Sequence, residues 1–128
     1  MNSTVETAVA EIRTLFPGHR VEAAPLSDGG ACVIVHDLPL SAAYEPETTW
    51  FGFVIPFNYP YADVYPHNID GSVKRKDGKP LGEGFSQTNG WQGRGLTNQI
   101  SRRSNRLDAE VDTAALKLAK VIEWVRSL

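Results

Sequence analysis

The fold is decided by Trp50-Phe51-Gly52-Phe53-Val54-Ile55-Pro56-Phe57-Asn58-Tyr59-Pro60. Aromatic and β-branched side chains pack well on a pleated surface, so this stretch predicts a buried strand over residues 48–57. Pro60 lacks an amide N–H and has a fixed φ, so the strand must end or turn by that residue. A second proline, Pro66, follows a short aromatic stretch and marks the next change of direction.

The chain on either side of this strand predicts a helix and a hairpin. Residues 4–16 carry apolar side chains at helical spacing, and Ser3-Thr4-Val5-Glu6 has the form of a capping box. Strands are expected over 20–26 and 31–35, joined by the turn Ser27-Asp28-Gly29-Gly30. Cys32 lies in the second of these strands, so we expect it to be a small buried hydrophobe that is not a nucleophile.

The second half of the chain is less regular. A fourth short strand is expected over 64–70, at an edge or irregular because of Pro66. Residues 71–107 show no period and are predicted to form a long irregular loop, which Phe85 and Trp91 attach to the core. Residues 108–128 predict a final helix with Asp112 as N-cap and Lys117 on its solvent side.

These elements predict one α+β domain over residues 1–128, with an N-terminal helix, a four-stranded antiparallel meander, a long loop and a C-terminal helix. One cysteine excludes an internal disulfide and a Cys-based zinc cluster, and three scattered histidines have no metal-ligand spacing. We therefore expect no metal and no cofactor. No apolar run could cross a membrane and the start has no signal-peptide core, so a cytoplasmic location is expected.

Charge is distributed unevenly along the chain. The formal net charge is −2, yet residues 71–106 contain eight Lys or Arg and two Asp or Glu, a local balance of +6. Such a split suggests an anionic partner for this segment, and a long solvated loop is the alternative interpretation. A nucleic acid is a weaker candidate, because the segment offers only two aromatic side chains for stacking and the whole chain is acidic.

The proline-rich stretch resembles the strand and turn of ubiquitin-conjugating enzymes, usually written F-P-x-x-Y-P-x-x-P-P. Phe57, Tyr59 and Pro60 match this motif, and Pro66 stands loosely in place of the last prolines. The element order is that of the same fold without its last two helices. In that family a nucleophilic cysteine lies just before the next helix, often as G-x-I-C-L. Ile100-Ser101 occupies this position, so the resemblance implies Ser101 as the acyl-carrying residue, with Ser104 as the alternative.

A serine hydroxyl is barely ionised at neutral pH and needs a base or electrostatic help to be acylated. Asp108 is the nearby candidate for base or orienting residue, and the candidates for stabilising an oxyanion are arginines. These arginines are Arg102, Arg103 and Arg106. The amide of the family's HPN motif could come from Asn98 or Asn105, whereas His67 is expected at a strand edge. The alternative interpretation makes Ser101 and Ser104 ordinary loop or capping residues.

A narrower resemblance is to a diverged bacterial group that lacks the catalytic cysteine and is encoded beside a ubiquitin-like protein and its activating enzyme. Trp91-Gln92, Ser101-Arg102 and Asn105 are similar to motifs of that group. It implies three protein partners: the ubiquitin-like protein, an adenylating activating enzyme and a target. The expected partner-binding residues are Trp91, Arg94, Arg102, Arg103 and Arg106. Two functions remain open, an acyl-carrying transferase and a silent module that only binds and positions a ubiquitin-like protein.

Overall fold

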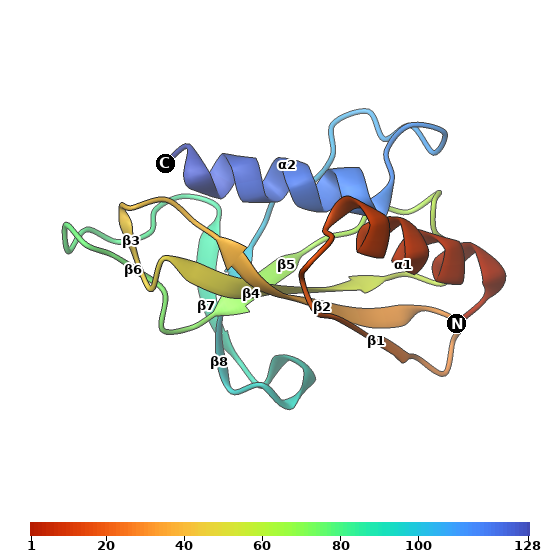
Figure 1. The fold of residues 1–128 in the computed structure, drawn as a ribbon, viewed down its shortest axis with the longest axis horizontal. Helices are drawn as coiled ribbons and strands as arrows, with labels where there is room; N and C mark the ends of the chain where they lie inside the picture. The colour runs from red at the N-terminus through yellow and green to blue at the C-terminus, as the bar shows by residue number, and fades with distance from the viewer.

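The computed structural model describes all residues 1–128 and has one antiparallel sheet of six strands beneath two helices. Figure 1 shows both helices on the same face of this sheet, so the α+β class is confirmed. In spatial order the strands are β1 (Val21–Pro25), β2 (Ala31–Pro39), β4 (Thr48–Ile55), β5 (His67–Asp70), β8 (Leu96–Ile100) and β7 (Phe85–Asn89). The short strands β3 (Tyr44–Glu45) and β6 (Lys74–Arg75) pair separately at one end.

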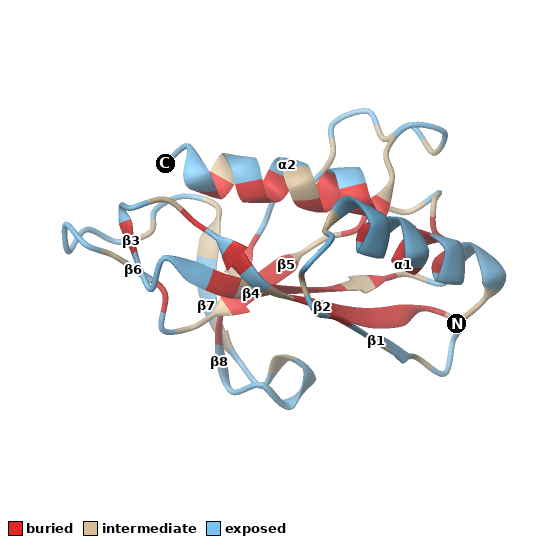
Figure 2. Cartoon of the chain, in the orientation of Figure 1, coloured by how far each residue is buried: buried red, intermediate tan, exposed pale blue.

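The hydrophobic core lies between the sheet and the helices. β4 contributes Phe51, Phe53 and Ile55, all with no exposed surface, and β2 contributes Val33 and Val35. These alternate residues share one face because side chains along a strand point to opposite sides in turn. Figure 2 shows the buried faces of both helices turned toward the sheet. The apolar 48–57 stretch therefore forms the strand that was predicted from it.

Helix α1 (Ser3–Leu15) follows the predicted range, but its cap differs. Asn2 is the N-cap, since its Oδ1 accepts a hydrogen bond from the Val5 N–H at 2.9 Å. The Asn2 side-chain amide also donates to the Phe57 carbonyl at 2.9 Å, which links the start of α1 to the turn that follows β4. An asparagine at this position satisfies one of the free N–H groups of the first turn.

Helix α2 (Ala114–Arg126) begins later than the sequence predicts. Thr113, not Asp112, is its N-cap and accepts a hydrogen bond from the Leu116 N–H at 3.1 Å. Residues 108–112 form turns before the helix. Neither helix is long and apolar enough to cross a membrane.

The prediction of a four-stranded sheet followed by an irregular 71–107 loop is wrong. This range contains β6, the hairpin β7–β8 and a single 3₁₀ turn η1 (Trp91–Gly93). β8 pairs with β5, so β5 is an interior strand and not the edge strand expected from Pro66. The proline precedes the first paired residue and does not interrupt the ladder. Thr97 and Asn98 of β8 are buried although they are polar, so this strand lacks the alternation of apolar and polar residues that predicts a strand.

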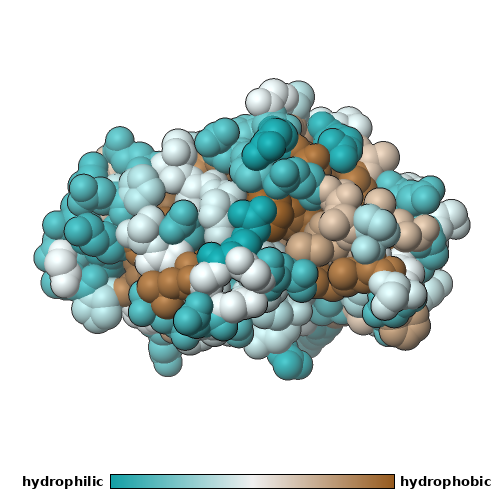
Figure 3. Space-filling model, turned by 90° about the horizontal axis from the view of Figure 1, so that it is seen from below, coloured by the Kyte–Doolittle hydropathy of each residue, from teal (hydrophilic) through white to brown (hydrophobic).

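The sheet face opposite the helices is partly covered by the turn between β7 and β8. Figure 3 views the molecule from this side and shows a mostly hydrophilic surface broken by apolar patches. The Trp91 ring stacks on Trp50 with ring centres 6.1 Å apart. A Cβ added to Gly52 would lie 2.6 Å from the Trp91 ring and 2.7 Å from Ile34, so only glycine at position 52 allows this close approach.

Candidate functional site

The connection between β8 and α2, residues 101–113, carries the predicted site residues Ser101 and Ser104. Its first residue is fixed to the sheet, since the Ser101 N–H donates to the Gly84 carbonyl at 2.8 Å. Ile100 pairs with His67, so the segment leaves the sheet beside the start of β5. In Figure 1 it passes α2 and loops above the N-terminal end of that helix.

A hydrogen-bonded cluster of Asp63, Ser104 and Lys117, the Asp63 cluster, anchors this segment. Lys117 Nζ lies 2.8 Å from Ser104 Oγ and 3.2 Å from each carboxylate oxygen of Asp63. The Ser104 hydroxyl donates to Asp63 Oδ1 at 2.9 Å and its backbone N–H donates to Oδ2 at 2.6 Å. Three distant parts of the chain meet here: the proline-rich turn, the 101–113 segment and helix α2.

The electrostatics of the Asp63 cluster make Ser104 an anchor. Burial raises the pKa of Asp63, but the hydrogen bonds from Ser104 and Lys117 outweigh it and lower the pKa overall. Asp63 is therefore a stabilised carboxylate and a weak base. The Ser104 hydroxyl donates to this carboxylate and its oxygen accepts from Lys117, so the side chain is held in place from both sides.

The prediction that Lys117 lies on the solvent side of the last helix is wrong, because only 7% of this residue is exposed. It follows Ala114 by three positions and precedes Val121 by four, which places it on the buried face of α2. Asp63 compensates for the burial of its charged group.

Ser101 is exposed and its side chain lies near Tyr65, whose ring is also contacted by Arg103; we call these three residues the Ser101 site. The guanidinium carbon of Arg103 lies 4.6 Å from the centre of the Tyr65 ring. Polar contacts with Arg103 and then with Ser101 lower the pKa of the Tyr65 phenol. Tyr65 is thus a titratable side chain near the Ser101 hydroxyl, and Arg103 places a positive charge over the Tyr65 ring.

Three arginines of the 101–113 segment form no ion pair, and we call them the arginine triplet: Arg102, Arg103 and Arg106. Arg102 stacks over Trp124 at 4.7 Å, so two of the three guanidinium groups are held by aromatic rings. A pocket of about 210 Å³ lies beside Arg102 and Arg103. Asn105 and Lys120 also line it, and Asp112 is its one carboxylate. An anionic group entering this pocket would meet mainly positive charge.

Two predicted partner-binding residues, Trp91 and Arg94, lie on the other face of the sheet. Arg94 stacks over Trp50 at 4.9 Å and pairs with Glu22 at 3.5 Å. The triplet lies on the helix side, where Arg102 contacts Trp124 of α2. The five residues predicted to bind a partner therefore divide between two separate surfaces.

The remaining polar candidates have structural contacts. Asp108 Oδ1 accepts from the Glu110 N–H at 3.0 Å within a turn, and Asp108 makes no hydrogen bond to Ser101. The side-chain amide of Asn98 donates to the carbonyls of Asp70 and Val73, each at 3.2 Å, so both of its hydrogens are occupied inside the sheet. Asn105, which borders the arginine pocket, is the asparagine that remains near the site.

His67 and Cys32 are buried. The expectation of His67 at a strand edge is wrong, because this residue has no exposed surface and its ring lies 5.0 Å from Phe53. Burial, aided by nearby Lys117, lowers its pKa to about 3, and neither ring nitrogen has a hydrogen-bond partner. Cys32 is buried in β2 as predicted, and burial raises the pKa of its thiol.

Sequence reasoning missed Asp63, Tyr65 and Lys117. The helical spacing of Lys117 with Ala114 and Val121 was a usable signal, since it places the lysine on the apolar stripe. Asp63 and Tyr65 lie between Pro60 and Pro66, and no local pattern indicates that this turn reaches the segment some 40 residues later.

Searches against protein-family models, curated proteins and solved structures found no match to this chain.

Proposed function

We propose that the protein is a ubiquitin-conjugating-enzyme-like acyl carrier of the cytoplasm. In this proposal Ser101 accepts the C-terminus of a ubiquitin-like protein from an activating enzyme and passes it to an amine of a target. The observation that carries the proposal is the contrast between the two candidate hydroxyls. Ser101 is exposed near Tyr65, whose ring is contacted by Arg103, whereas Ser104 is engaged on both its hydrogen and its oxygen.

The fold is compatible with this proposal. Helix α1, the antiparallel strands β1, β2, β4 and β5, and helix α2 follow one another in the order of a ubiquitin-conjugating fold trimmed of its last two helices. The β7–β8 hairpin is then an addition inserted between the meander and α2. It supplies Ile100, the buried residue immediately before Ser101.

The proposed first step is transfer from a thioester of the activating enzyme. The Ser101 oxygen forms a bond to the carbonyl carbon, the carbon–sulfur bond breaks, and the serine proton passes through Tyr65 to the departing thiolate. Arg103 stabilises the negative charge that develops on the carbonyl oxygen. In the second step an amine replaces the serine oxygen, forming an amide and regenerating the hydroxyl.

A silent binding module is the second candidate function. It is favoured by the absence of a histidine or carboxylate hydrogen-bonded to Ser101, because a lone hydroxyl is a poor nucleophile without a strong base. In that case the arginine triplet would bind and position a ubiquitin-like protein or its activating enzyme with no covalent step.

A thioester peptide can separate the two functions without knowledge of the natural partners. The probe is an acyl-Gly-Gly peptide carried as a soluble alkyl thioester, incubated with the protein and followed by intact mass spectrometry. Acyl transfer predicts one adduct that resists dithiothreitol, is cleaved by hydroxylamine, and is absent from Ser101→Ala. Ser86→Ala, which removes another exposed hydroxyl, is the matched control and should retain the adduct.

The outcomes differ clearly. An adduct that persists in Ser101→Ala and maps to another side chain would move the site. If no adduct forms with the peptide or with a charged activating enzyme, while the ubiquitin-like protein still binds, the silent module is the correct function.

A further inference from the structure

Strand β7 leaves one edge of the six-stranded sheet unpaired. It lies last in the strand order and pairs only with β8. The Ser101 N–H donates to the Gly84 carbonyl and the Gly90 N–H donates to the Gly95 carbonyl, at the two ends of this ladder. Antiparallel pairing alternates, so the backbone groups of Gln87 and Asn89 point outward and have no partner within the chain.

The two edges of the sheet are protected differently. β1 ends in Pro25, and its Val21 carbonyl accepts a hydrogen bond from the Arg13 side chain at 3.0 Å. β7 reads Phe-Ser-Gln-Thr-Asn and contains neither a proline nor a charge, the features that usually keep an edge from pairing with another chain. This edge is therefore open to a further strand.

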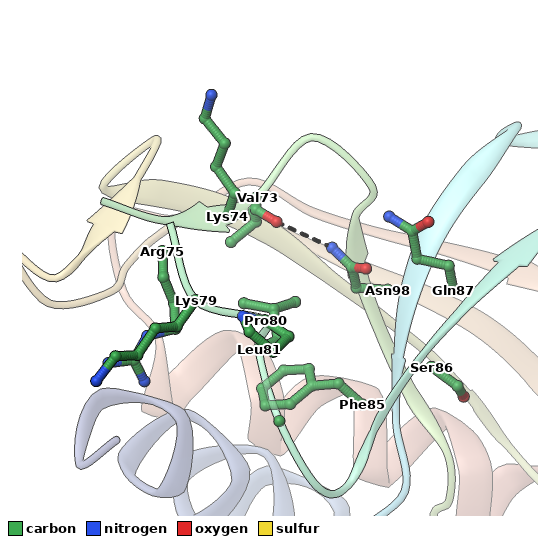
Figure 4. A pocket seen from close by; sticks show the side chains of 11 residues that line it. Val73, Lys74, Arg75, Lys79, Pro80, Leu81, Phe85, Ser86, Gln87 and Asn98 are labelled. Atoms are coloured by element: carbon green, nitrogen blue, oxygen red, sulfur yellow. Dashed lines mark hydrogen bonds between the residues drawn. The ribbon is translucent and has the colours of Figure 1, made fainter. Parts of the chain in front are cut away.

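A cleft of about 540 Å³ borders β7 on the side of the 73–82 segment. Figure 4 shows Pro80, Leu81 and Phe85 at its centre, with Gln87 on the strand side and Lys79 on the opposite side. The volume is within the range of typical ligand pockets, roughly 300–1,000 Å³. The cleft thus offers an apolar floor next to free backbone donors and acceptors.

The charge of the cleft selects its occupant. Its lining includes Lys74, Arg75 and Lys79 and no carboxylate. Arg75 is paired with Asp77 at 2.7 Å, but Lys74 and Lys79 form no ion pair. A strand that pairs with β7 while carrying acidic side chains would satisfy both the backbone and the two free ammonium groups.

We propose that β7 and the adjoining cleft bind an extended acidic segment of a partner protein by strand addition. The main-chain bonds to Gln87 and Asn89 supply affinity, and the lysines select for negative charge. Neither Ser101 nor the arginine triplet lines this cleft, and strand addition needs no covalent step, so the proposal does not rest on acyl transfer.

The probe is a fluorescent octapeptide of alternating glutamate and valine, measured by anisotropy. It should bind the full chain with a Kd below about 1 mM, whereas the same peptide with lysine for glutamate should bind at least about tenfold more weakly. Lys79→Gln should weaken binding of the acidic peptide about threefold. Arg126→Gln, which removes an equal charge from an exposed position outside the cleft, should not change it.

Amide exchange tests the strand addition itself. The Gln87 and Asn89 amides should exchange more slowly when the acidic peptide is bound, and N-methylation of alternate peptide amides should abolish binding. Equal losses in Lys79→Gln and Arg126→Gln, or unchanged exchange at both amides, would overturn the proposal. A dimer that forms through β7 in the absence of peptide, seen as a doubled mass, would also overturn it, because the occupant of the edge would then be a second copy of this chain.

Discussion

Mild acid should destabilise the protein through His67, because the folded chain resists protonation of this ring. Its pKa falls from 6.5 to about 3 on folding, mainly through burial. Between these two pH values the unfolded state binds one more proton than the folded state. The free energy of unfolding therefore falls by about 1.36 kcal/mol for each unit by which the pH is lowered. The contribution is fully present above pH 6.5 and shrinks by about 2 kcal/mol on descent to about pH 5.

This window can be separated from that of the carboxylates. The lowered pKa of Asp63 contributes stability above its ordinary value of 3.8, and this contribution is lost only as the pH falls below that value. The range between pH 6.5 and about pH 5 therefore reports chiefly on the buried ring.

The assay is urea unfolding followed by tryptophan fluorescence across this pH range. His67→Leu replaces the ring, and its two unbonded nitrogens, with an apolar side chain of similar volume. As the pH is lowered, the free energy of unfolding of this variant should fall less steeply than that of the wild type. The two slopes should differ by about 1.36 kcal/mol per pH unit. His19→Gln, at a partly exposed position, is the matched control and should follow the wild type. Parallel curves for wild type and His67→Leu would refute the reasoning.

Three further outcomes are expected. Lys117→Met should lower the free energy of unfolding in urea by about 2–3 kcal/mol, because it leaves the partly buried Asp63 carboxylate without its ion pair. A second change in the same chain, Asp63→Asn, should restore part of this loss. Gly52→Ala should displace the Trp91 ring and cost about 1–3 kcal/mol, with a red-shifted tryptophan emission, while unchanged emission would contradict the tight contact. Changing the arginine triplet to glutamine should weaken binding of an activating enzyme or ubiquitin-like protein and flatten its salt dependence; equal affinity at low salt would identify a merely solvated loop.

The sequence predicted the elements whose burial is apolar. Helix α1, strands β1, β2 and β4, and most of α2 follow directly from hydrophobic spacing, and the structure confirms them. The hairpin β7–β8 was not predicted, because two of its three buried residues, Thr97 and Asn98, are polar. Thr97 donates to Asn68 at 3.1 Å and contacts Thr88 at 2.9 Å, so hydrogen bonds replace the hydrophobic signal that a periodicity search requires.

The candidate site was predictable in part for a similar reason. The positions of Ser101 and Ser104 before the last helix could be predicted from the order of elements. Their different environments could not, because these depend on Asp63 and Tyr65, which reach the site from a turn distant in sequence. Contacts of this kind depend on tertiary packing and leave no local trace in composition or spacing.

The Asp63 cluster also divides the β8–α2 connection into two unequal spans. Ser101 lies on a short one, fixed at Gly84 on one side and at Ser104 on the other, so it has little freedom to move. Residues 105–112 form the longer span between Ser104 and the cap at Thr113. Since the entropic cost of loop closure grows by only about 0.6 kcal/mol for each doubling of length, the longer span can accept inserted residues with little penalty. New recognition sequences could therefore be added there, by evolution or by engineering, while the geometry around Ser101 stays unchanged.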